Sequence, residues 1–405
     1  MPHAPEALYS FTIPSIHDDT ALNCRVYHPD TSSAAGWTTS GPGQSSRMRG
    51  IIMAHPYAPM GGSYDDRVVG IVVDEFLKAG WVVGTFNFRG AHGSKARTSW
   101  SGKPELDDYT SFAAFFMHYL SYLKPYPKLV PLELSPVVSE AEYHESFARQ
   151  RVDEGPIVIL GGYSYGSHIL RHLPPVPSVL QPFVAPIAGS ASDEIILRAR
   201  KLAEQSNMAW RDLVRNHERE SRSRKKGHEP KHSVTMGGEE TTPEKRRTSR
   251  EVRRSTDRRL SVELGNRLRS LSHGHRRHKD DSPPTPLETH EVAPIIMPEV
   301  RYLLISPLTP PISTLAAPAL GHKFWHKSKG SSEEVVAHHI GLAVYGDQDI
   351  FTSARRIRDW SEQLKAMQGS RFSSVEVADA GHFWVERGVE EKLRGALREW
   401  EAGVR

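Results

Sequence analysis

The sequence predicts an α/β protein, with a mostly parallel central sheet and helices on both faces. Residues with helical periodicity, at 65–79 and 107–123, alternate with short aliphatic runs. Such runs are typical of strands buried on both faces of a parallel sheet, and they occur at 50–54, 157–160, 300–305 and 340–345. The chain has 405 residues and 38% hydrophobic content, which is enough for a sizeable core.

The expected elements can be placed in order along the chain. Strands at 8–13 and 22–27 form an antiparallel pair, and the Gly/Ser/Thr-rich stretch 32–46 is a loop. The parallel part then has a strand at 50–54, a helix at 65–79, a strand at 81–87, a helix at 107–123, a Pro-containing connection at 124–155 and a strand from Ile157. Three more strands complete the sheet, at 300–305, 340–345 and 372–378.

The segment Ile157–Gly166, with the sequence IVILGGYSYG, carries the most informative motif. Its aliphatic strand leads directly into Gly162-Tyr163-Ser164-Tyr165-Gly166, which matches the pattern G-x-S-x-G. In a nucleophile elbow of this pattern, the serine occupies a sharp turn between strand and helix, and the two glycines let these elements approach closely. The pattern alone is common, and the preceding buried strand is what favours an elbow over an ordinary glycine-rich loop.

A serine nucleophile needs a base, and the base needs a group that holds its tautomer. The C-terminal third of the chain offers both. The aliphatic run 340–345 ends in Gly346-Asp347-Gln348-Asp349, and the strand 372–378 leads into Asp379-Ala380-Gly381-His382. The chain order is therefore serine, acid, histidine, and either Asp347 or Asp349 can be the acid.

This order resembles that of the α/β-hydrolase superfamily. Further motifs resemble a small, largely uncharacterised branch of its serine hydrolases, and the resemblance spans 49–190 and 298–400. The resemblance implies the α/β-hydrolase fold, with Ser164 as nucleophile, His382 as base and Asp349 as acid. Asp349 is preferred to Asp347 because the superfamily's usual acid is the second carboxylate of Gly-Asp-x-Asp. The branch motifs are His55-Pro56, Gly61-Gly62-Ser63, Asn87-Phe88-Arg89-Gly90 and Gly93-Ser94.

Acyl transfer also needs backbone N–H donors for the developing oxyanion. One donor is expected to be Tyr165, the residue after the nucleophile. The other is expected in the loop after the strand 50–54, where Tyr57 is chosen because Pro56 has no N–H. His55 in the same loop is expected to hydrogen-bond within the loop rather than take part in the chemistry.

Other histidines compete with His382 for the role of base. His168 follows Ser164 by one helical turn, so its side chain is expected to pack along the helix instead of pointing at the hydroxyl. His338 and His339 precede the strand 340–345, which places them at the wrong edge of a parallel sheet.

A basic segment interrupts the predicted domain. Over residues 211–281 there are 21 Lys/Arg and 12 Asp/Glu, a net charge of +9 in a chain whose total is +4. The segment has almost no aromatic residue and cannot bury enough apolar surface to fold alone, so we predict a long disordered insertion at 211–290. The hydrolase domain is then made of an N-terminal part, 1–195, and a C-terminal part, 298–405.

The insertion contains Arg246-Arg247-Thr248-Ser249 and Arg258-Arg259-Leu260-Ser261, so Ser249 and Ser261 resemble sites of basophilic kinases. The same basic cluster could serve as a nuclear import signal, and the sequence does not separate the two. A nucleic-acid-binding role is disfavoured against a solvated linker, because no aromatic residues are interleaved with the charges.

Composition restricts location and cofactors. There is no cationic start followed by an apolar stretch, and no apolar run long enough to span a membrane, so neither secretion nor membrane insertion is expected. The single cysteine, Cys24, excludes an intramolecular disulfide. We expect a cytoplasmic protein, nuclear if the basic cluster is an import signal, with no cofactor and no metal.

The predicted function is a serine hydrolase that cleaves a small-molecule carboxylic ester, with a thioester or an amide as variants. A peptidase-like enzyme, an acyltransferase on the same triad and a non-catalytic scaffold remain as alternatives, because a fold alone does not define the reaction. Substrate contacts are expected from the loops 57–64, 90–104 and 306–329. The apolar residues of the last loop either line an acyl pocket or pack as a short cap, namely Pro310, Pro311, Leu315, Phe324 and Trp325.

Overall fold

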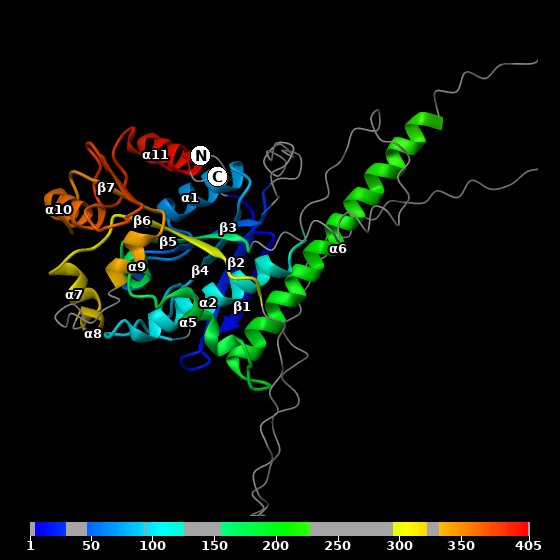
Figure 1. The fold of residues 1–405 in the computed structure, drawn as a ribbon, viewed down its shortest axis with the longest axis horizontal. Coiled ribbons are helices and arrows are strands. Elements are labelled where there is room, and N and C mark those ends of the chain that lie inside the picture. The colour runs from blue at the N-terminus through cyan, green and yellow to red at the C-terminus, as the bar shows by residue number, and fades with distance from the viewer. Residues whose placement is uncertain are drawn as a thin grey trace, which may run out of the picture. The chain divides into compact units, whose positions relative to one another are not determined.

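The computed structural model describes residues 5–29, 47–92, 94, 96–124, 155–226, 295–321 and 332–403. The chain divides into two units: Met1–Ser221 together with Leu287–Arg405, and Arg222–Pro286. Within the first unit, segments far apart in the sequence contribute to one sheet (Figure 1). The second unit contains the positions Ser249 and Ser261, which lie outside the described residues.

The sheet has eight strands in the order β1-β2-β4-β3-β5-β6-β7-β8. β1 pairs antiparallel with β2, and β2 pairs antiparallel with β4, whereas all other neighbours are parallel. The expected antiparallel pair and the expected parallel strands are therefore confirmed. Their bounds are β1 (Tyr9–Pro14), β2 (Ala21–Tyr27), β3 (Arg49–Ala54), β4 (Val82–Phe86), β5 (Ile157–Tyr163), β6 (Glu299–Ile305), β7 (Gly341–Gly346) and β8 (Phe372–Val377).

Helices cover both faces of the sheet, which confirms the predicted α/β class (Figure 1). One face carries α1 (Arg67–Lys78) and α11 (Val389–Gly403). The other carries α2 (Lys103–Tyr122), α4 (Tyr165–Leu170), α5 (Val176–Leu180), the first part of α6 (Ala191–Lys226) and α10 (Ala354–Lys365). The connections contain η2 (Ala58–Met60), η3 (Gln181–Phe183), α7 (Ile312–Ala316), α8 (Pro318–Gly321) and α9 (Ser332–His338).

The central strands are largely apolar because both of their faces are buried. In β3, Ile52 belongs to the core beneath α2, and its neighbours Ile51 and Met53 belong to the core beneath α1. Successive side chains of a strand point to opposite faces, so a strand between two layers of helices is apolar at nearly every position. All three side chains are fully buried.

Helix α2 begins earlier than expected, at Lys103 rather than Asp107. Gly102 occupies the position before the helix with a φ of 77°, a left-handed conformation that glycine adopts without strain. Pro104 lies in the first turn, where its missing N–H costs no helical hydrogen bond. The predicted start was late because the first turn carries few apolar residues.

Helix α6 corrects the predicted insertion at its N-terminal end, because residues 211–226 are helical up to Lys226. The side chains that α6 buries include Ala199, Ala203 and Trp210, and the residues that follow, Arg211–Leu213, are exposed. The basic composition from residue 211 onward thus marks where α6 stops burying side chains, but it does not mark where the helix ends. Arg, Lys and Glu are good helix formers, and a helix already nucleated by packing can be extended by such residues.

Candidate active site

The candidate nucleophile lies at the junction of β5 and α4. Ser164 has φ 53° and ψ −112°, a conformation that residues other than glycine rarely adopt. Its N–H donates to the carbonyl of Ile305 (2.9 Å), and its carbonyl accepts the hydroxyl of Ser167 (2.7 Å). These bonds hold the strained turn, which has the form of a nucleophile elbow.

The two glycines of the motif are required by close backbone contacts. A Cβ on Gly162 would lie 2.4 Å from the carbonyl carbon of Gly166. A Cβ on Gly166 would lie 2.6 Å from the carbonyl oxygen of Ala54 and 2.8 Å from that of His55. The elbow therefore packs directly on the end of β3, and only glycine fits at both positions.

The structure brings the three predicted side chains together in one hydrogen-bonded chain. Ser164 Oγ lies 2.8 Å from Nε2 of His382, and Nδ1 of His382 lies 2.7 Å from Oδ2 of Asp349. A carboxylate only accepts, so the proton is on Nδ1, and Nε2 accepts the hydroxyl proton of Ser164. All three residues are buried, with exposed fractions of 4 to 8%.

Asp349, and not Asp347, contacts the histidine. Oδ1 of Asp349 accepts the N–H groups of Phe351 (2.8 Å) and Thr352 (3.0 Å), which leaves Oδ2 directed at His382. Asp347 lies at the same strand end, and its own N–H donates to the carbonyl of Val377. The backbone donors that orient Asp349 could not be identified from the sequence, since any residue type can supply them.

The histidine is held on its backbone and on its ring. The hydroxyl of Tyr163, at the end of β5, donates to the carbonyl of His382 (2.8 Å). The ring of Phe351 packs edge-on against the imidazole with centroids 4.6 Å apart, and that of Phe383 does so at 5.5 Å. Neither Tyr163 nor Phe351 was singled out from the sequence, although Tyr163 lies inside the elbow motif.

The two expected oxyanion donors lie on adjacent segments. Tyr165 begins α4 and Tyr57 precedes η2, and their rings are in contact with centroids 5.1 Å apart. The first N–H groups of a helix have no partner within the helix. In the described residues, neither N–H takes part in the backbone hydrogen bonds of turns, loops or caps.

His55 links the loops after β3 and β4. Its Nδ1–H donates to the carbonyl of Pro56 (2.6 Å), and its Nε2 accepts the N–H of Phe88 (2.9 Å). Burial lowers the pKa of His55 to about 4, so the ring is neutral and can make both bonds. The expected hydrogen bond within the loop is confirmed, and the ring serves the backbone around the candidate site.

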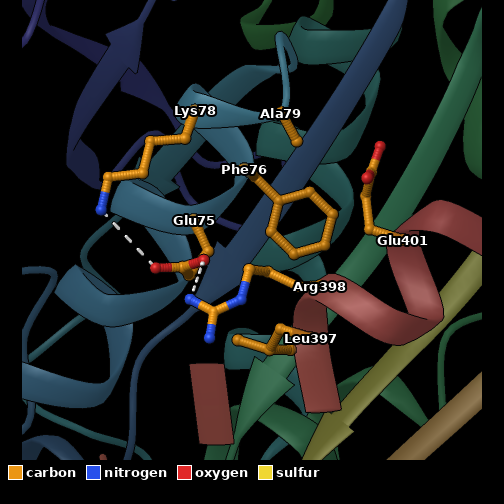
Figure 2. Close-up of a pocket in the computed structure, with 7 residues that line it drawn as sticks. All are labelled: Glu75, Phe76, Lys78, Ala79, Leu397, Arg398 and Glu401. Carbon is orange, nitrogen blue, oxygen red and sulfur yellow. Dashed lines mark hydrogen bonds and ion pairs between the residues drawn. The ribbon is translucent and has the colours of Figure 1, made fainter. Parts of the chain in front are cut away.

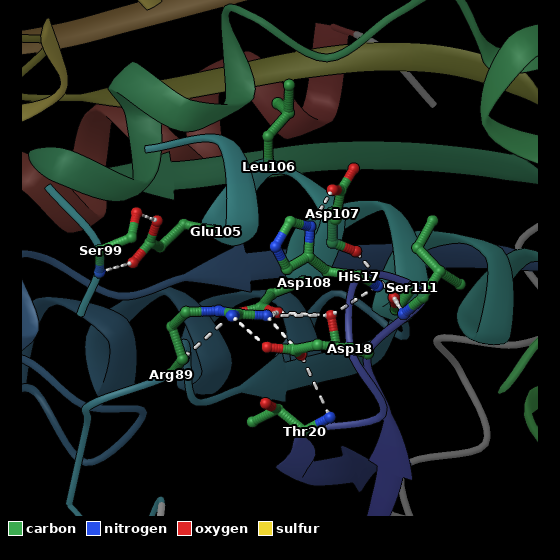
Figure 3. A network of polar contacts seen from close by, with 12 residues as sticks. His17, Asp18, Thr20, Arg89, Ser99, Glu105, Leu106, Asp107, Asp108 and Ser111 are labelled. Carbon is green, nitrogen blue, oxygen red and sulfur yellow. Dashed lines mark hydrogen bonds and ion pairs between the residues drawn. The ribbon is translucent and has the colours of Figure 1, made fainter. Parts of the chain in front are cut away.

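Arg89 is the centre of a polar network below these loops (Figure 3). Its guanidinium donates to Asp108 of α2 (2.7 and 2.9 Å) and to Asp18 in the turn between β1 and β2 (2.9 and 3.1 Å). Burial alone would raise the pKa of the Asp18 carboxyl. The hydrogen bonds from Arg89 outweigh burial and lower this pKa to about 2. Arg89 thus ties the end of β4 to two other elements.

The competing histidines lie apart from the triad. His168 is buried in α4, and its ring packs near those of Tyr165 and His172 with centroids 6.5 and 4.7 Å away. His338 ends α9 and His339 precedes β7, so both lie at the opposite edge of the sheet from Ser164.

A hollow of about 270 Å³ lies between the C-terminal parts of α1 and α11 (Figure 2). Its charged groups have partners within the protein: Glu75 pairs with Lys78 and Arg398, and Glu401 accepts the indole N–H of Trp81. Both helices return from the carboxyl edge of the sheet, so this hollow lies at the edge away from Ser164. Its ion pairs account for its polar lining without a ligand.

Within the described ranges, no three His, Cys, Asp or Glu side chains are grouped in a way that could hold a metal ion. None of the helices in the described part of the chain has the length and hydropathy of a membrane span. The α/β-hydrolase fold combines such a sheet and elbow with the chain order serine, acid, histidine. This chain has the same combination, with Ser164, Asp349 and His382 in that order.

Comparison with known proteins gives only distant structural likenesses. No protein-family model matches the chain, and no curated protein matches it. It is similar to an α/β serine hydrolase homologue from Coxiella burnetii (12% identity, 97% of each chain covered, TM-score 0.41). It is also similar to an α/β serine hydrolase without lid from Xanthomonas campestris (14% identity, 100% of this chain and 98% of that chain covered, TM-score 0.42). Such low identities and TM-scores identify neither a reaction nor a substrate for this chain.

Proposed function

We propose that this chain is a serine hydrolase that cleaves a small-molecule carboxylic ester through Ser164, His382 and Asp349. The proposal rests on the unbroken chain of hydrogen bonds from Ser164 Oγ to His382 (2.8 Å) and from His382 to Asp349 (2.7 Å). A strained serine at a strand-to-helix turn, with an imidazole in reach and a carboxylate behind it, is the arrangement that activates a hydroxyl for acyl transfer.

The reaction proceeds in two halves. Ser164 Oγ attacks the ester carbonyl carbon while its proton moves to Nε2 of His382, and the imidazolium is stabilised by Asp349. The proton then passes to the leaving alcohol as the C–O bond breaks, which leaves Ser164 acylated. His382 then takes a proton from water, which attacks the acyl carbon, and returns that proton to Ser164 Oγ as the bond between Oγ and the acyl carbon breaks and the acid leaves. The N–H groups of Tyr165 and Tyr57 are the donors proposed for the oxyanion in both halves.

An apolar acyl or alcohol group is favoured by the residues at the strand ends. Ile350 and Phe383, which flank the residues of the triad, are 76% and 47% exposed. Trp100, after β4, is 75% exposed, and Met60, after β3, is 63% exposed. The loops that carry these four residues all follow parallel strands of one sheet, so they lie at the same sheet edge as the triad. Exposed apolar groups around a site are suited to an apolar ligand. A thioester would be accepted by the same geometry.

The decisive experiment is labelling of the purified full-length protein with a fluorophosphonate probe, followed by turnover of p-nitrophenyl acetate. We expect Ser164→Ala to abolish labelling and turnover. His382→Ala and Asp349→Asn should reduce turnover on the order of 10³-fold or more.

Asp347→Asn is the matched control, since it changes an acid at the same strand end that does not contact His382 in the structure. It should keep turnover within about fivefold of the wild type, well short of the loss seen when a triad member is removed. Near-normal turnover of Ser164→Ala would refute the mechanism. No labelling and no turnover in the folded wild type would favour a non-catalytic scaffold.

We also propose that Ser249 and Ser261 are phosphorylated by a basophilic kinase, on the basis of the paired arginines before each serine. Phosphorylation would add close to two negative charges at each position in a strongly basic segment. Mass spectrometry after treatment with a basophilic kinase tests this, and the double alanine variant is the control. Absence of phosphate at both serines would contradict it.

A further inference from the structure

A second cavity, of about 330 Å³, lies beside α4, between the loop after β6, α7 and α10. Ser164, Asp349 and His382 are not among the residues that line it. The polar side chains on its wall include the imidazole of His168, the hydroxyls of Thr309 and Ser313, the guanidinium groups of Arg171 and Arg356 and the carboxylate of Asp359. Its volume is in the range of sites for small molecules.

Two buried polar groups of this wall have no hydrogen-bond partner in the described structure. The imidazole of His168 is only 2% exposed, and neither of its ring nitrogens is bonded. The hydroxyl of Thr309, a residue 6% exposed, is also unpartnered. Buried polar groups in native proteins are nearly always satisfied, so such groups on the wall of a cavity indicate that a molecule in the cavity supplies their partner.

The charges of the wall indicate the kind of molecule. Arg171 stacks its guanidinium over the ring of Trp360 at 4.4 Å and donates to the carbonyl of Leu308 (3.0 Å). Arg356 donates to the carbonyl of Pro310 (3.1 Å). With Asp359 as the carboxylate and the imidazole neutral, the wall carries one excess positive charge. Guanidinium groups beside hydroxyl and imidazole donors are the usual partners of oxyanions.

We propose that this cavity is a binding site for a small molecule that carries an oxyanion, either a carboxylate or a phosphate, held by His168, Thr309 and the two arginines. The anion accepts from the Thr309 hydroxyl, from one N–H of His168 and from the guanidinium groups. None of the three triad side chains lines this site, and the proposal does not depend on the proposed hydrolase function.

Burial lowers the pKa of His168 well below its ordinary value, so the ring is neutral when no anion is near. An anion beside it favours the protonated form and raises its pKa. Binding below neutral pH should therefore take up protons, and this signature is not expected from an anion held only by surface arginines.

The test is calorimetric titration of the full-length protein with inorganic phosphate and, separately, with benzoate, in about 0.15 M salt, where surface attraction is screened. We expect saturable one-to-one binding of at least one of the two, and their relative affinities distinguish the phosphate class from the carboxylate class. Arg356→Gln should weaken binding about tenfold, because it removes a charge-assisted hydrogen bond. Arg355→Gln should not, because Arg355 is exposed like Arg356 but does not line the cavity.

Two further arms distinguish the proposed site from the active site and from surface arginines. His382→Ala should leave the affinity unchanged, and a loss there would place the anion in the active site instead. Titration in two buffers of different ionisation enthalpy should show proton uptake in the wild type that is absent in His168→Gln. No saturable binding of either probe, or equal weakening by the variants of Arg355 and Arg356, would overturn the proposal.

Discussion

Replacing Gly166 by alanine tests whether the close contact between the elbow and β3 positions Ser164, the proposed nucleophile. The added Cβ would lie 2.6 Å from the carbonyl oxygen of Ala54 and 2.8 Å from that of His55. Both are backbone atoms at the end of a central strand, so neither can rotate away. Helix α4 must shift instead, and Ser164 precedes that helix directly.

The size of the shift follows from these distances. To reach a usual van der Waals separation of roughly 3.5 Å, the contacts must open by roughly 0.7 to 0.9 Å. If Ser164 moves with the helix, its 2.8 Å bond to His382 lengthens to roughly 3.6 Å, which is no longer a hydrogen bond. A misplacement of about 1 Å costs on the order of 10²-fold in rate, and we expect that loss in turnover.

The assay is the turnover of p-nitrophenyl acetate and the rate of fluorophosphonate labelling, measured with thermal unfolding on the same samples. Gly70→Ala is the matched control, because a Cβ on Gly70 in α1 meets nothing within 4 Å. It should keep normal turnover and gain roughly 0.5 to 1 kcal/mol of stability, since alanine is the better helix former. A folded Gly166→Ala protein that labels and turns over like the wild type would refute the role of this contact.

Four other perturbations test separate parts of the structure. Tyr57→Pro, which the φ of −60° allows, removes the N–H of one proposed oxyanion donor and should lower turnover about 10²-fold or more. Tyr57→Ala keeps this N–H and should lose much less turnover. Equal losses in the two variants would contradict the donor role. Arg89→Met removes the cation paired with the buried Asp108 and should cost about 3–5 kcal/mol in denaturant unfolding. A cost below about 1 kcal/mol would mean that the ion pair contributes little to stability. The pKa of His55 is about 4 in the folded protein against 6.5 ordinarily, so the unfolded state binds more protons between these two values. The free energy of unfolding should therefore fall as pH falls from 6.5 to about 4, and it should fall less steeply in His55→Asn. The same slope in both proteins would show that another group causes the pH dependence. A Gly/Ser linker in place of residues 216–286 should leave turnover near normal, because the helix-to-strand connection joins the sheet at the edge away from Ser164. A large fall in kcat in a folded deletion protein would show that the segment reaches the active site.

The sequence by itself determined the sheet and the position of the candidate nucleophile. Strand runs such as 157–160 and 300–305 are apolar at nearly every position because both of their faces are buried, and this pattern is visible without any structure. The elbow was equally visible, because Gly162 and Gly166 are needed for contacts that no other residue allows. These features are readable because their physical cause lies within a few consecutive residues.

Only the tertiary structure decided features that depend on groups distant in the chain. Asp347 and Asp349 are equivalent as residue types at one strand end, and the contact with His382 distinguishes them because two backbone N–H groups orient Asp349. The continuation of α6 through residues 211–226 follows from a helix nucleated by packing, which composition does not report. The unpartnered imidazole of His168 became visible only when α4, α7 and α10 were assembled around one cavity, since burial and hydrogen bonding are properties of the folded chain.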